Sequence, residues 1–489
     1  MRTNTFSFYA LLLLLICLPI PLGANRVWAW SLVSIWVGVM TMGMLSSYRK
    51  DWRQFPVRRL LRFAWLLAPM LAFQLWVVIQ LLPLPISWLT YVSPLSASVN
   101  AQLGVKFGSI TLDTYATLST LQKGFTYLLF AINAIVLVNT PRKVKWVLAA
   151  LLASGTFQAF YGAMVVLLGL KHSLVFELVL PDVATGSFVY KNHLANYLML
   201  CLCAGAGLLV SQLHVSSSSS WRERLARWIG GVLSIKMFVR IALIVMVIGL
   251  VMTRSRMGNT AFFAATLIGG VAALMFYRSK PRALVALIVS LLVIDTFVVG
   301  SVFGLAKVKQ RLEETALTAE TRDEVVAWSA EIIESVPIVG SGGGSFYTVF
   351  PAFSHSNLGF YDHAHNEYVQ FAVEFGIPAT IMLGVMCLYA IWLCVFAMRN
   401  RNSKTLKGTA LGCLMAVVGM LIHISVDFNL QPTANAMTFV LILVLCGVSA
   451  RMLIGTHREV QNPANTSDGS SIANASINLP EGIPCFQKS

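Results

Sequence analysis

Runs of about 20 apolar residues recur along the 489-residue chain, and they limit its possible folds more than any other feature. One such run is long enough for a helix to cross the hydrocarbon core of a bilayer. We predict about twelve transmembrane spans, at residues 6–24, 27–46, 63–90, 124–139, 146–170, 193–213, 240–256, 258–277, 283–305, 374–398, 408–426 and 436–453. The expected fold class is therefore an all-α membrane protein.

The composition agrees with lipid as the main solvent. Hydrophobic residues make up 57% of the chain and charged residues only 11%, against roughly 25% charged residues in a soluble domain. The length alone would suit roughly two or three soluble domains, but one helical bundle with its loops uses the whole chain. No second domain is needed.

The basic residues are concentrated between the apolar runs. A formal net charge of +16 would suggest nucleic-acid binding in a soluble protein. However, 25 of the 36 Lys and Arg residues lie near the chain ends or in five short segments: 49–62, 142–145, 222–240, 278–282 and 399–407. These segments alternate with weakly basic ones, which is the positive-inside pattern. We therefore predict two cytoplasmic termini and exclude nucleic acid as a partner.

The cysteines and the N-terminus indicate little processing. Seven of the eight cysteines fall in apolar spans and Cys485 lies in the tail, so we expect neither a disulfide framework nor a Cys-rich zinc site. Residues 1–24 resemble either a cleaved signal peptide or a first helix, and we favour the uncleaved helix.

The spans divide the chain into three regions. Residues 1–145 hold the first four spans, residues 146–453 hold the other eight, and residues 454–489 form a polar, flexible tail. The largest segment outside the membrane is 306–373, between the ninth and tenth spans. Recurring apolar positions in 307–335 predict amphipathic helices near the membrane surface, which Pro337 ends. We expect a helical outer subdomain here.

A glycine cluster follows this predicted helix. Residues Gly340 to Ser345 read Gly-Ser-Gly-Gly-Gly-Ser, which is typical of a flexible turn. Such a turn can also hold a phosphate on its backbone amides, although this one lacks a Walker lysine. Both interpretations stay open on the sequence alone.

Four polar patches lie on the predicted outer side. They are Gly186–Phe188 with Lys191–His193, Thr253–Arg256, Arg322, and His363–Glu367. Membrane enzymes assemble a site from helix ends and loops in this way. The convergence of four patches from distant parts of the chain therefore predicts a functional site.

Two arginines stand out at the outer end of the seventh span. A cation beside hydrocarbon is costly unless it snorkels, pairs or binds an anion. Snorkelling or a salt bridge explains Arg254 as well as anion binding does, whereas the tight turn at Arg256 favours an anion. Lys191 and His193 suit contact with a lipid carrier or a sugar, although anchoring at the interface explains Lys191 equally well.

The histidines of the last patch admit two chemistries. His363, His365 and Glu367 could bind zinc, but a His-x-His pair usually needs a third ligand at a recognisable position. A general base near neutral pH needs one positioned imidazole. We favour His365 as a base over a metal site.

Three further polar residues receive weaker interpretations. Asp295, inside the ninth span, is either functional or paired with another helix. His423 and Asp427 lie four residues apart on one helical face and form a possible orienting pair.

The patches resemble a known family. The run His365-Asn366-Glu367-Tyr368-Val369-Gln370, followed by Glu374-Phe375-Gly376, is similar to the signature of the O-antigen ligase and O-antigen polymerase family. The Gly186–Phe188 segment running to Leu198, the Ser255-Arg256 pair, and Arg322 with Trp328 resemble its upstream motifs in the same order. The resemblance covers roughly residues 150 to 450, within the membrane region 146–453, and places the loop 306–373 in the periplasm.

This resemblance implies a metal-independent, inverting glycosyltransferase without a cofactor. Such an enzyme transfers a glycan from an undecaprenyl diphosphate carrier to a hydroxyl of a glycan, lipid A-core or protein acceptor. The reaction takes place at the periplasmic face of the bacterial inner membrane, in surface polysaccharide biosynthesis. The expected catalytic residues are His365 as the base, and Arg256 and Arg322 as stabilisers of the diphosphate. The expected substrate-binding residues are Arg254, Lys191, His193, His363, Asn366 and Glu367.

Two rival functions come from other classes. A secondary transporter, for example one related to inorganic carbon, also has about twelve spans, although the sequence lacks the paired broken helices in two similar halves that such folds show. A non-catalytic subunit of a polysaccharide assembly machine would need the fold but not His365.

Overall fold

The computed structural model describes residues 2–174, 176–212, 235–277, 322–355 and 361–453, with four further positions between 285 and 293. Nine described helices are long and apolar enough to cross a membrane. They are α2 (Val27–Ser46), α4 (Ala64–Leu81), α7 (Thr114–Leu137), α8 (Pro141–Leu167), α9 (Lys191–Ser211), α12 (Arg256–Phe276), α17 (Ile377–Asn400), α18 (Lys404–His423) and α19 (Thr433–Arg451).

Two shorter apolar helices, α1 (Arg2–Cys17) and α11 (Ile235–Met252), coincide with two more predicted spans. The predicted span 283–305, with Asp295, lies almost wholly outside the described residues, as do residues 307–321 and the tail. The all-α membrane fold is thus confirmed.

The third span is shorter than predicted, and the fourth span is longer than predicted. Helix α4 ends at Leu81, because Pro83 and Pro85 cannot continue it. The chain then forms β1 (Leu84–Pro85), α5 (Ile86–Val92), α6 (Pro94–Gln102) and β2 (Phe107–Gly108), and the two strands pair antiparallel. Helix α7 begins at Thr114 rather than at residue 124, since the Asp113 side chain caps it by accepting from the Ala116 amide at 2.9 Å.

Helix α9 forms the centre of the bundle. Every residue from His193 to Ser211 is buried, and α8, α11, α12, α18 and α19 surround the helix. Its closest neighbour is α18, where glycines bring the two backbones together. A methyl group at Gly408 would lie 2.5 Å from the Gly207 carbonyl oxygen, and one at Gly412 would lie 2.5 Å from the Cys203 carbonyl oxygen. Small residues allow such close packing between membrane helices.

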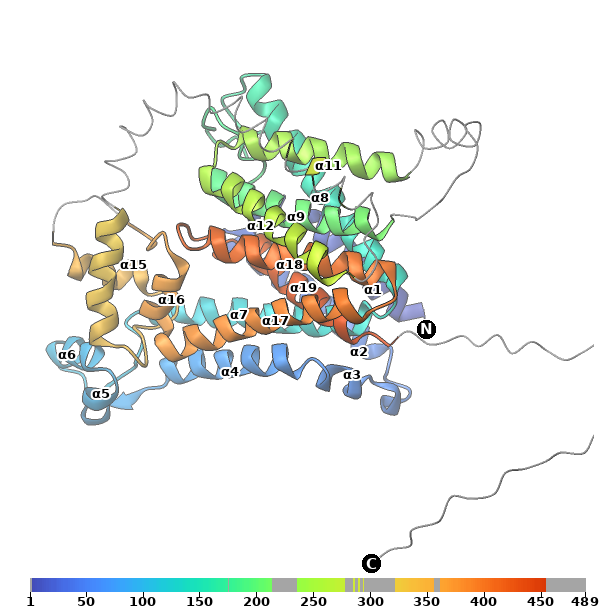
Figure 1. Cartoon of the computed structure of the whole chain (residues 1–489). Coiled ribbons are helices and arrows are strands. Elements are labelled where there is room, and N and C mark those ends of the chain that lie inside the picture. The colour runs from blue at the N-terminus through green and yellow to red at the C-terminus, as the bar shows by residue number, and fades with distance from the viewer. Residues whose placement is uncertain are drawn as a thin grey trace, which may run out of the picture. The chain divides into compact units, whose positions relative to one another are not determined.

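The remaining elements are short. Those outside the long helices are α3 (Val57–Leu61), α15 (Phe346–Val349), α16 (Glu367–Phe375), and the 3-10 turns Leu22–Ala24, Trp52–Gln54 and Phe350–Phe353. Helices α5, α6, α15 and α16 gather at the end of the long helices opposite to α3 and the N-terminus (Figure 1). We call this the outer end.

The outer elements have a hydrophobic core of their own. Residues 322–335 form a helix, and its Val325 and Ile332 pack with Leu89 of α5 and Phe346 of α15. The described part of the predicted amphipathic helix therefore packs onto other outer elements, and it ends two residues before Pro337.

The glycine turn joins this core to the bundle. Gly340, Gly342 and Gly344 have positive φ, which glycine adopts without strain. The amides from Ser341 to Ser345 all donate hydrogen bonds within the protein, to Val373, Glu374, Gln80 and Gly342. No amide of this run is left for a phosphate, so the phosphate-binding interpretation is wrong and the turn is a fixed structural joint.

Candidate functional site

The loop between α18 and α19, residues 424–432, lies at the outer end and carries a buried acid, Asp427. Its carboxylate accepts hydrogen bonds from the Phe428 amide, at 3.0 Å, and from the side-chain amide of Asn192 at the start of α9. The third neighbour is His365, whose Nδ1 lies 3.8 Å from Asp427 Oδ1. The His365 side chain is 16% exposed and that of Asp427 is 2% exposed, so the pair lies at the edge of the protein interior.

The surroundings keep Asp427 ionised. Burial by itself would raise the pKa of this carboxyl group. Four neighbours outweigh burial and hold the pKa of Asp427 below its usual value: His365, His423, His193 and the Phe428 amide. A buried carboxylate beside an imidazole fixes the orientation of the ring and stabilises the imidazolium, as in catalytic triads.

Phe428 holds three histidines in place. Its ring is stacked on that of His363, with the ring centroids 4.2 Å apart. It makes edge contacts with His365, at a centroid distance of 4.9 Å, and with His193, at 5.0 Å. The ring of Tyr190 stacks on it at 5.6 Å. One aromatic side chain therefore brings together residues from 190 to 193, from 363 to 365 and from the α18–α19 loop.

The backbone at His365 has an uncommon conformation. Its φ is +50°, in the left-handed region that non-glycine residues seldom adopt. The next residue, Asn366, begins α16: its side chain accepts from the amides of Tyr368 and Val369 at 3.1 and 3.3 Å. Strained residues of this kind cluster at functional sites. The predicted substrate contact Asn366 has a structural role as the helix cap.

A hydrogen-bonded chain connects His363 to the glycine turn. The Gln370 side-chain amide donates to His363 Nδ1 at 3.1 Å and to Glu374 Oε1 at 3.0 Å, and Glu374 Oε2 accepts from the Gly344 amide at 2.9 Å. Burial lowers the pKa of His363. A neutral His363 whose Nδ1 accepts carries its proton on Nε2. These hydrogen bonds connect the loop that carries His363 to the glycine turn at Gly344.

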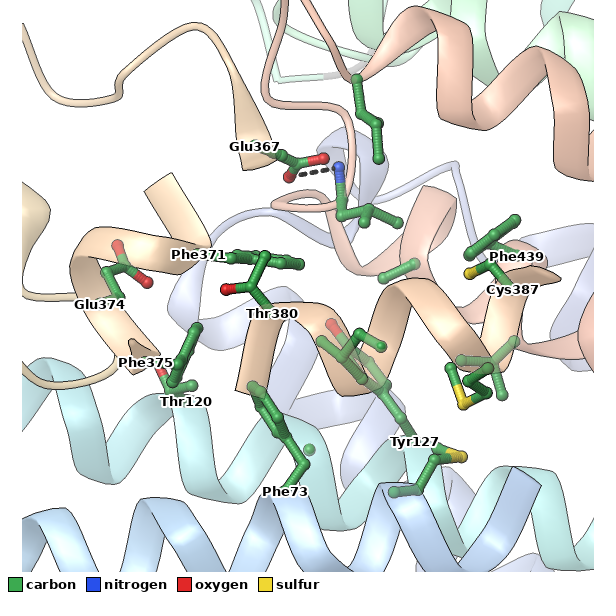
Figure 2. A pocket seen from close by; sticks show the side chains of 18 of the residues that line it. Phe73, Thr120, Tyr127, Glu367, Phe371, Glu374, Phe375, Thr380, Cys387 and Phe439 are labelled. Atoms are coloured by element: carbon green, nitrogen blue, oxygen red, sulfur yellow. Dashed lines mark hydrogen bonds between the residues drawn. The ribbon is translucent and has the colours of Figure 1, made fainter. Parts of the chain in front are cut away.

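Two buried glutamates, Glu367 and Glu374, form hydrogen bonds that connect α16 to its neighbouring loops. Glu367 Oε1 accepts from the Leu430 amide at 2.8 Å, which connects α16 to the loop carrying Asp427 (Figure 2). Burial raises the pKa of Glu367 well above its usual value. Burial also raises the pKa of Glu374 to about 7, although hydrogen bonds from Gly344 and Gln370 oppose the shift.

Both glutamates line an apolar chamber of about 260 Å³ (Figure 2). Its walls come from α4, α7, α16, α17, α18 and α19. Most of the lining is hydrophobic, including Phe73, Phe371, Phe375 and Phe439. The chamber lies among the membrane helices, next to the histidine loop.

Arg322 reaches the site through Tyr190. The two side chains form a hydrogen bond, and Tyr190 also accepts from Asn192 at 2.8 Å. Burial and the charge of Asp427 raise the pKa of Tyr190 to about 12, against the lowering effect of Arg322. The tyrosine is therefore a neutral link between the arginine and Phe428.

The Arg254–Arg256 turn lies close to the start of α9. It joins α11 to α12, and its Ser255 side chain caps α12 by accepting from the Gly258 amide at 3.2 Å. Gly258 packs directly on Ala195 of α9, near Asn192 and His193. Arg254 has a φ of +51°, and both arginines are exposed. Lys191, the first residue of α9, lies in the same region.

The structure thus brings His193, His363 and His365 together, with Arg322 adjacent and the cationic turn on one flank. The predicted partnership of Asp427 with His423 is not the closest one: Asp427 faces His365, while both ring nitrogens of the buried His423 have no hydrogen-bond partner among the described residues. The roles of Phe428, Tyr190 and Gln370 were not predicted from the sequence. An aromatic residue next to an acid, in a short loop after a predicted span, was the available signal.

Among the residues the structure describes, no three His, Cys, Asp or Glu side chains are placed to hold a metal ion. Metal independence stays a prediction.

A comparison with known protein families gives a match, mostly in the second half of the chain. Residues 241–384 match a family model described as O-antigen ligase, which supports that family for this chain. The matched range includes Arg254, Arg256, Arg322, His363 and His365 and stops before Asp427. No curated protein matches the chain.

Proposed function

Starting from the O-antigen ligase region at residues 241–384, we propose that the protein is a glycosyltransferase of surface polysaccharide biosynthesis. It moves a glycan from undecaprenyl diphosphate to an acceptor hydroxyl at the periplasmic face of the bacterial inner membrane. The acceptor is a glycan, lipid A-core or a protein. The observation that carries the proposal is the His365–Asp427 pair, with Nδ1 of the imidazole 3.8 Å from the buried carboxylate.

The chemistry is a single displacement. His365 takes the proton of the acceptor hydroxyl through Nε2, and the hydroxyl oxygen attacks the anomeric carbon. The bond from that carbon to the diphosphate oxygen breaks, and the lipid diphosphate leaves with its negative charge. Attack from the side opposite the leaving group inverts the anomeric centre. Asp427, 3.8 Å from Nδ1, stabilises the imidazolium that forms.

The cations stabilise the negative charge of the diphosphate leaving group. Arginine binds phosphate oxygens through its planar, bidentate fork and stays charged. Arg256 and Arg322 stabilise the diphosphate, with Arg254 beside Arg256 in the turn and Lys191 at the start of α9. His193, His363 and Glu367 then have a positioning role, through Phe428 and Leu430.

The lipid part of the donor needs an apolar environment close to the reacting atoms. The chamber lined by Phe73, Phe371, Phe375 and Phe439 offers one, next to the loop that carries His365. We propose that the first isoprene units of the carrier, or an acyl chain of a lipid acceptor, enter this chamber.

The test compares His365→Ala, Arg322→Ala and a control, His355→Ala. His355 lies in the same outer region but is exposed and pairs with Glu331 at 2.8 Å, away from Asp427. Carrier-linked glycan and transferred product are quantified in cells with equal membrane levels of each variant. We expect the first two variants to lose product and accumulate the donor, while the control keeps both at wild-type levels.

Normal product from His365→Ala would contradict the catalytic role and favour the non-catalytic subunit. A loss of substrate movement without accumulation of a lipid-linked glycan would favour the transporter. The chemical identity of the lost product also identifies the acceptor.

A further inference from the structure

A cavity of about 1110 Å³ lies at the inner end of the long helices, opposite to the histidines. Its walls come from the start of α8, the end of α9, and the starts of α11 and α18. This is the end that the basic segments assign to the cytoplasm. None of the residues discussed for glycan transfer lines it.

Three cations of the described part of the chain line this cavity: Arg142 and Lys145 of α8, and Lys404 of α18. All three are exposed, and no Asp or Glu lies among the lining residues that the structure describes. Within the described ranges, none of the three forms a hydrogen bond or ion pair with another residue. The positive-inside rule explains why cations occur in these loops. It does not explain why two loops more than 250 residues apart place theirs around one cavity.

The rest of the lining is largely apolar and partly exposed. Trp146 is 51% exposed and Phe238 is 66% exposed, and Leu152 and Leu208 line the wall further in. On α8 the lining runs from Arg142 to Thr156, which is about 21 Å along a helix axis. One leaflet of hydrocarbon is about 15 Å deep. The cavity therefore extends from headgroup depth through most of the inner leaflet.

We propose that this cavity binds an anionic diacyl phospholipid of the cytoplasmic leaflet. Arg142, Lys145 and Lys404 bind the phosphate headgroup, and an acyl chain lies along the apolar wall of α8 and α11. Basic pockets between membrane helices on the cytoplasmic side suit such headgroups. The site is separate from glycan transfer, so its occupancy is measured without reference to that activity.

The test uses the purified full-length protein in detergent and native mass spectrometry. Phosphatidylglycerol or phosphatidylcholine is titrated into the wild type, into the cavity variant R142Q/K145Q/K404Q, and into the control variant R49Q/K50Q/R53Q. The control removes the same charge from exposed residues of the same side that do not line the cavity.

Each cation near a membrane surface contributes about 5-fold in affinity for anionic lipid. We expect wild type and control to bind phosphatidylglycerol alike and the cavity variant to bind it roughly 100-fold more weakly. Phosphatidylcholine should bind weakly to all three. Because the contacts are electrostatic, the difference should shrink as salt is raised.

Three results would overturn the proposal. Equal weakening in both variants would mean that only the bulk charge matters. Release of bound phosphatidylglycerol by millimolar inorganic phosphate would indicate a site for free anions. A photo-crosslinker introduced at Phe238 that captures residues 213–234 of the same chain, rather than phosphatidylglycerol, would show that the chain itself fills the cavity.

Discussion

The backbone of His365 is in a strained conformation. The residue has a left-handed backbone, one ring nitrogen 3.8 Å from a buried carboxylate, and an aromatic partner shared with two other histidines. Non-glycine residues in this backbone region cost about 1–3 kcal/mol. The hydrogen bonds of Asn366 and Gln370 on either side of the loop offset that strain.

Asp427→Asn should reduce kcat for glycan transfer by roughly 100- to 10000-fold, because an amide cannot stabilise the imidazolium as a carboxylate does. The KM for the lipid-linked donor should change by less than about 3-fold, since the proposed role of Asp427 acts on His365 rather than on the diphosphate. Purified enzyme with a defined donor and acceptor separates the two constants.

The control for this prediction is Asp182→Asn, an exposed outer acid that pairs with Lys171 at 3.0 Å. It should retain wild-type kcat. A large change in KM with normal kcat in Asp427→Asn would show that Asp427 acts in binding instead.

Glu374 should make the folded state less stable as pH rises. Its pKa is raised from an ordinary value of 4.5 to about 7 in the folded chain, so folding retains its proton between these values. Stability should therefore fall between pH 4.5 and pH 7, by up to about 3 kcal/mol for this buried group. Glu374→Gln should remove that part of the fall.

The measurement is the thermal unfolding temperature of both proteins in the same detergent at pH 5, 6, 7 and 8. Other groups titrate equally in both, so the difference between the two curves isolates Glu374. Parallel curves would mean that the carboxyl group titrates in the folded chain as it does in the unfolded one.

The sequence predicted the histidines and arginines of the site because each stands out beside an apolar run. It did not predict Phe428, since an aromatic residue near a span end is usually an interfacial anchor. Its contacts with His193, His363 and His365 exist only when three distant segments meet. Similarly, Gln370 gains its role from the fold that places Glu374 and Gly344 beside it.

Helices were the most predictable level of structure, because hydrophobic length alone identifies them. Their ends were less predictable. The apolar run 63–90 continues past Leu81, but Pro83 and Pro85 and the pairing of β1 with β2 turn its last part into outer structure. The central place of α9 also could not be read from hydropathy, because spans at the centre and at the rim are equally apolar.

Gly408→Ala should destabilise the contact between α9 and α18. The added methyl group would lie 2.5 Å from the Gly207 carbonyl oxygen, so the two backbones would have to separate. Overpacking of this kind costs typically about 1–3 kcal/mol. We expect a lower thermal unfolding temperature in detergent and a lower yield of folded protein.

Gly38→Ala is the matched control, because a methyl group there meets nothing within 4 Å and Ala favours a helix. It should unfold at or slightly above the wild-type temperature. Equal unfolding temperatures of the two variants would mean that α18 can move away from Gly207 without loss of stability.

At the scale of the whole molecule, the structure separates an end with histidines and buried acids from an end rich in Lys and Arg. We propose from the charge pattern that the first end faces the periplasm. A thiol introduced at the exposed Asp182, by Asp182→Cys, should therefore react with a membrane-impermeant reagent in intact cells whose outer membrane is permeabilised.

A thiol introduced by Lys50→Cys, exposed at the other end, should react only after the inner membrane is opened. The wild type gives the background, since its seven described cysteines are buried or half-buried. The reverse pattern would invert the topology and move the proposed reaction to the cytoplasm.

The enclosure of α9 has a consequence for how this protein is made. Besides their local partner Tyr190, its polar residues Asn192 and His193 contact Asp427 and Phe428, which lie beyond α18. The ribosome must therefore add about 190 residues after α9 before α18 even begins. Until then these side chains face lipid or the insertion machinery, and a polar group in hydrocarbon is costly. Newly made chains should thus depend on an insertase that retains α9 until its later neighbours arrive.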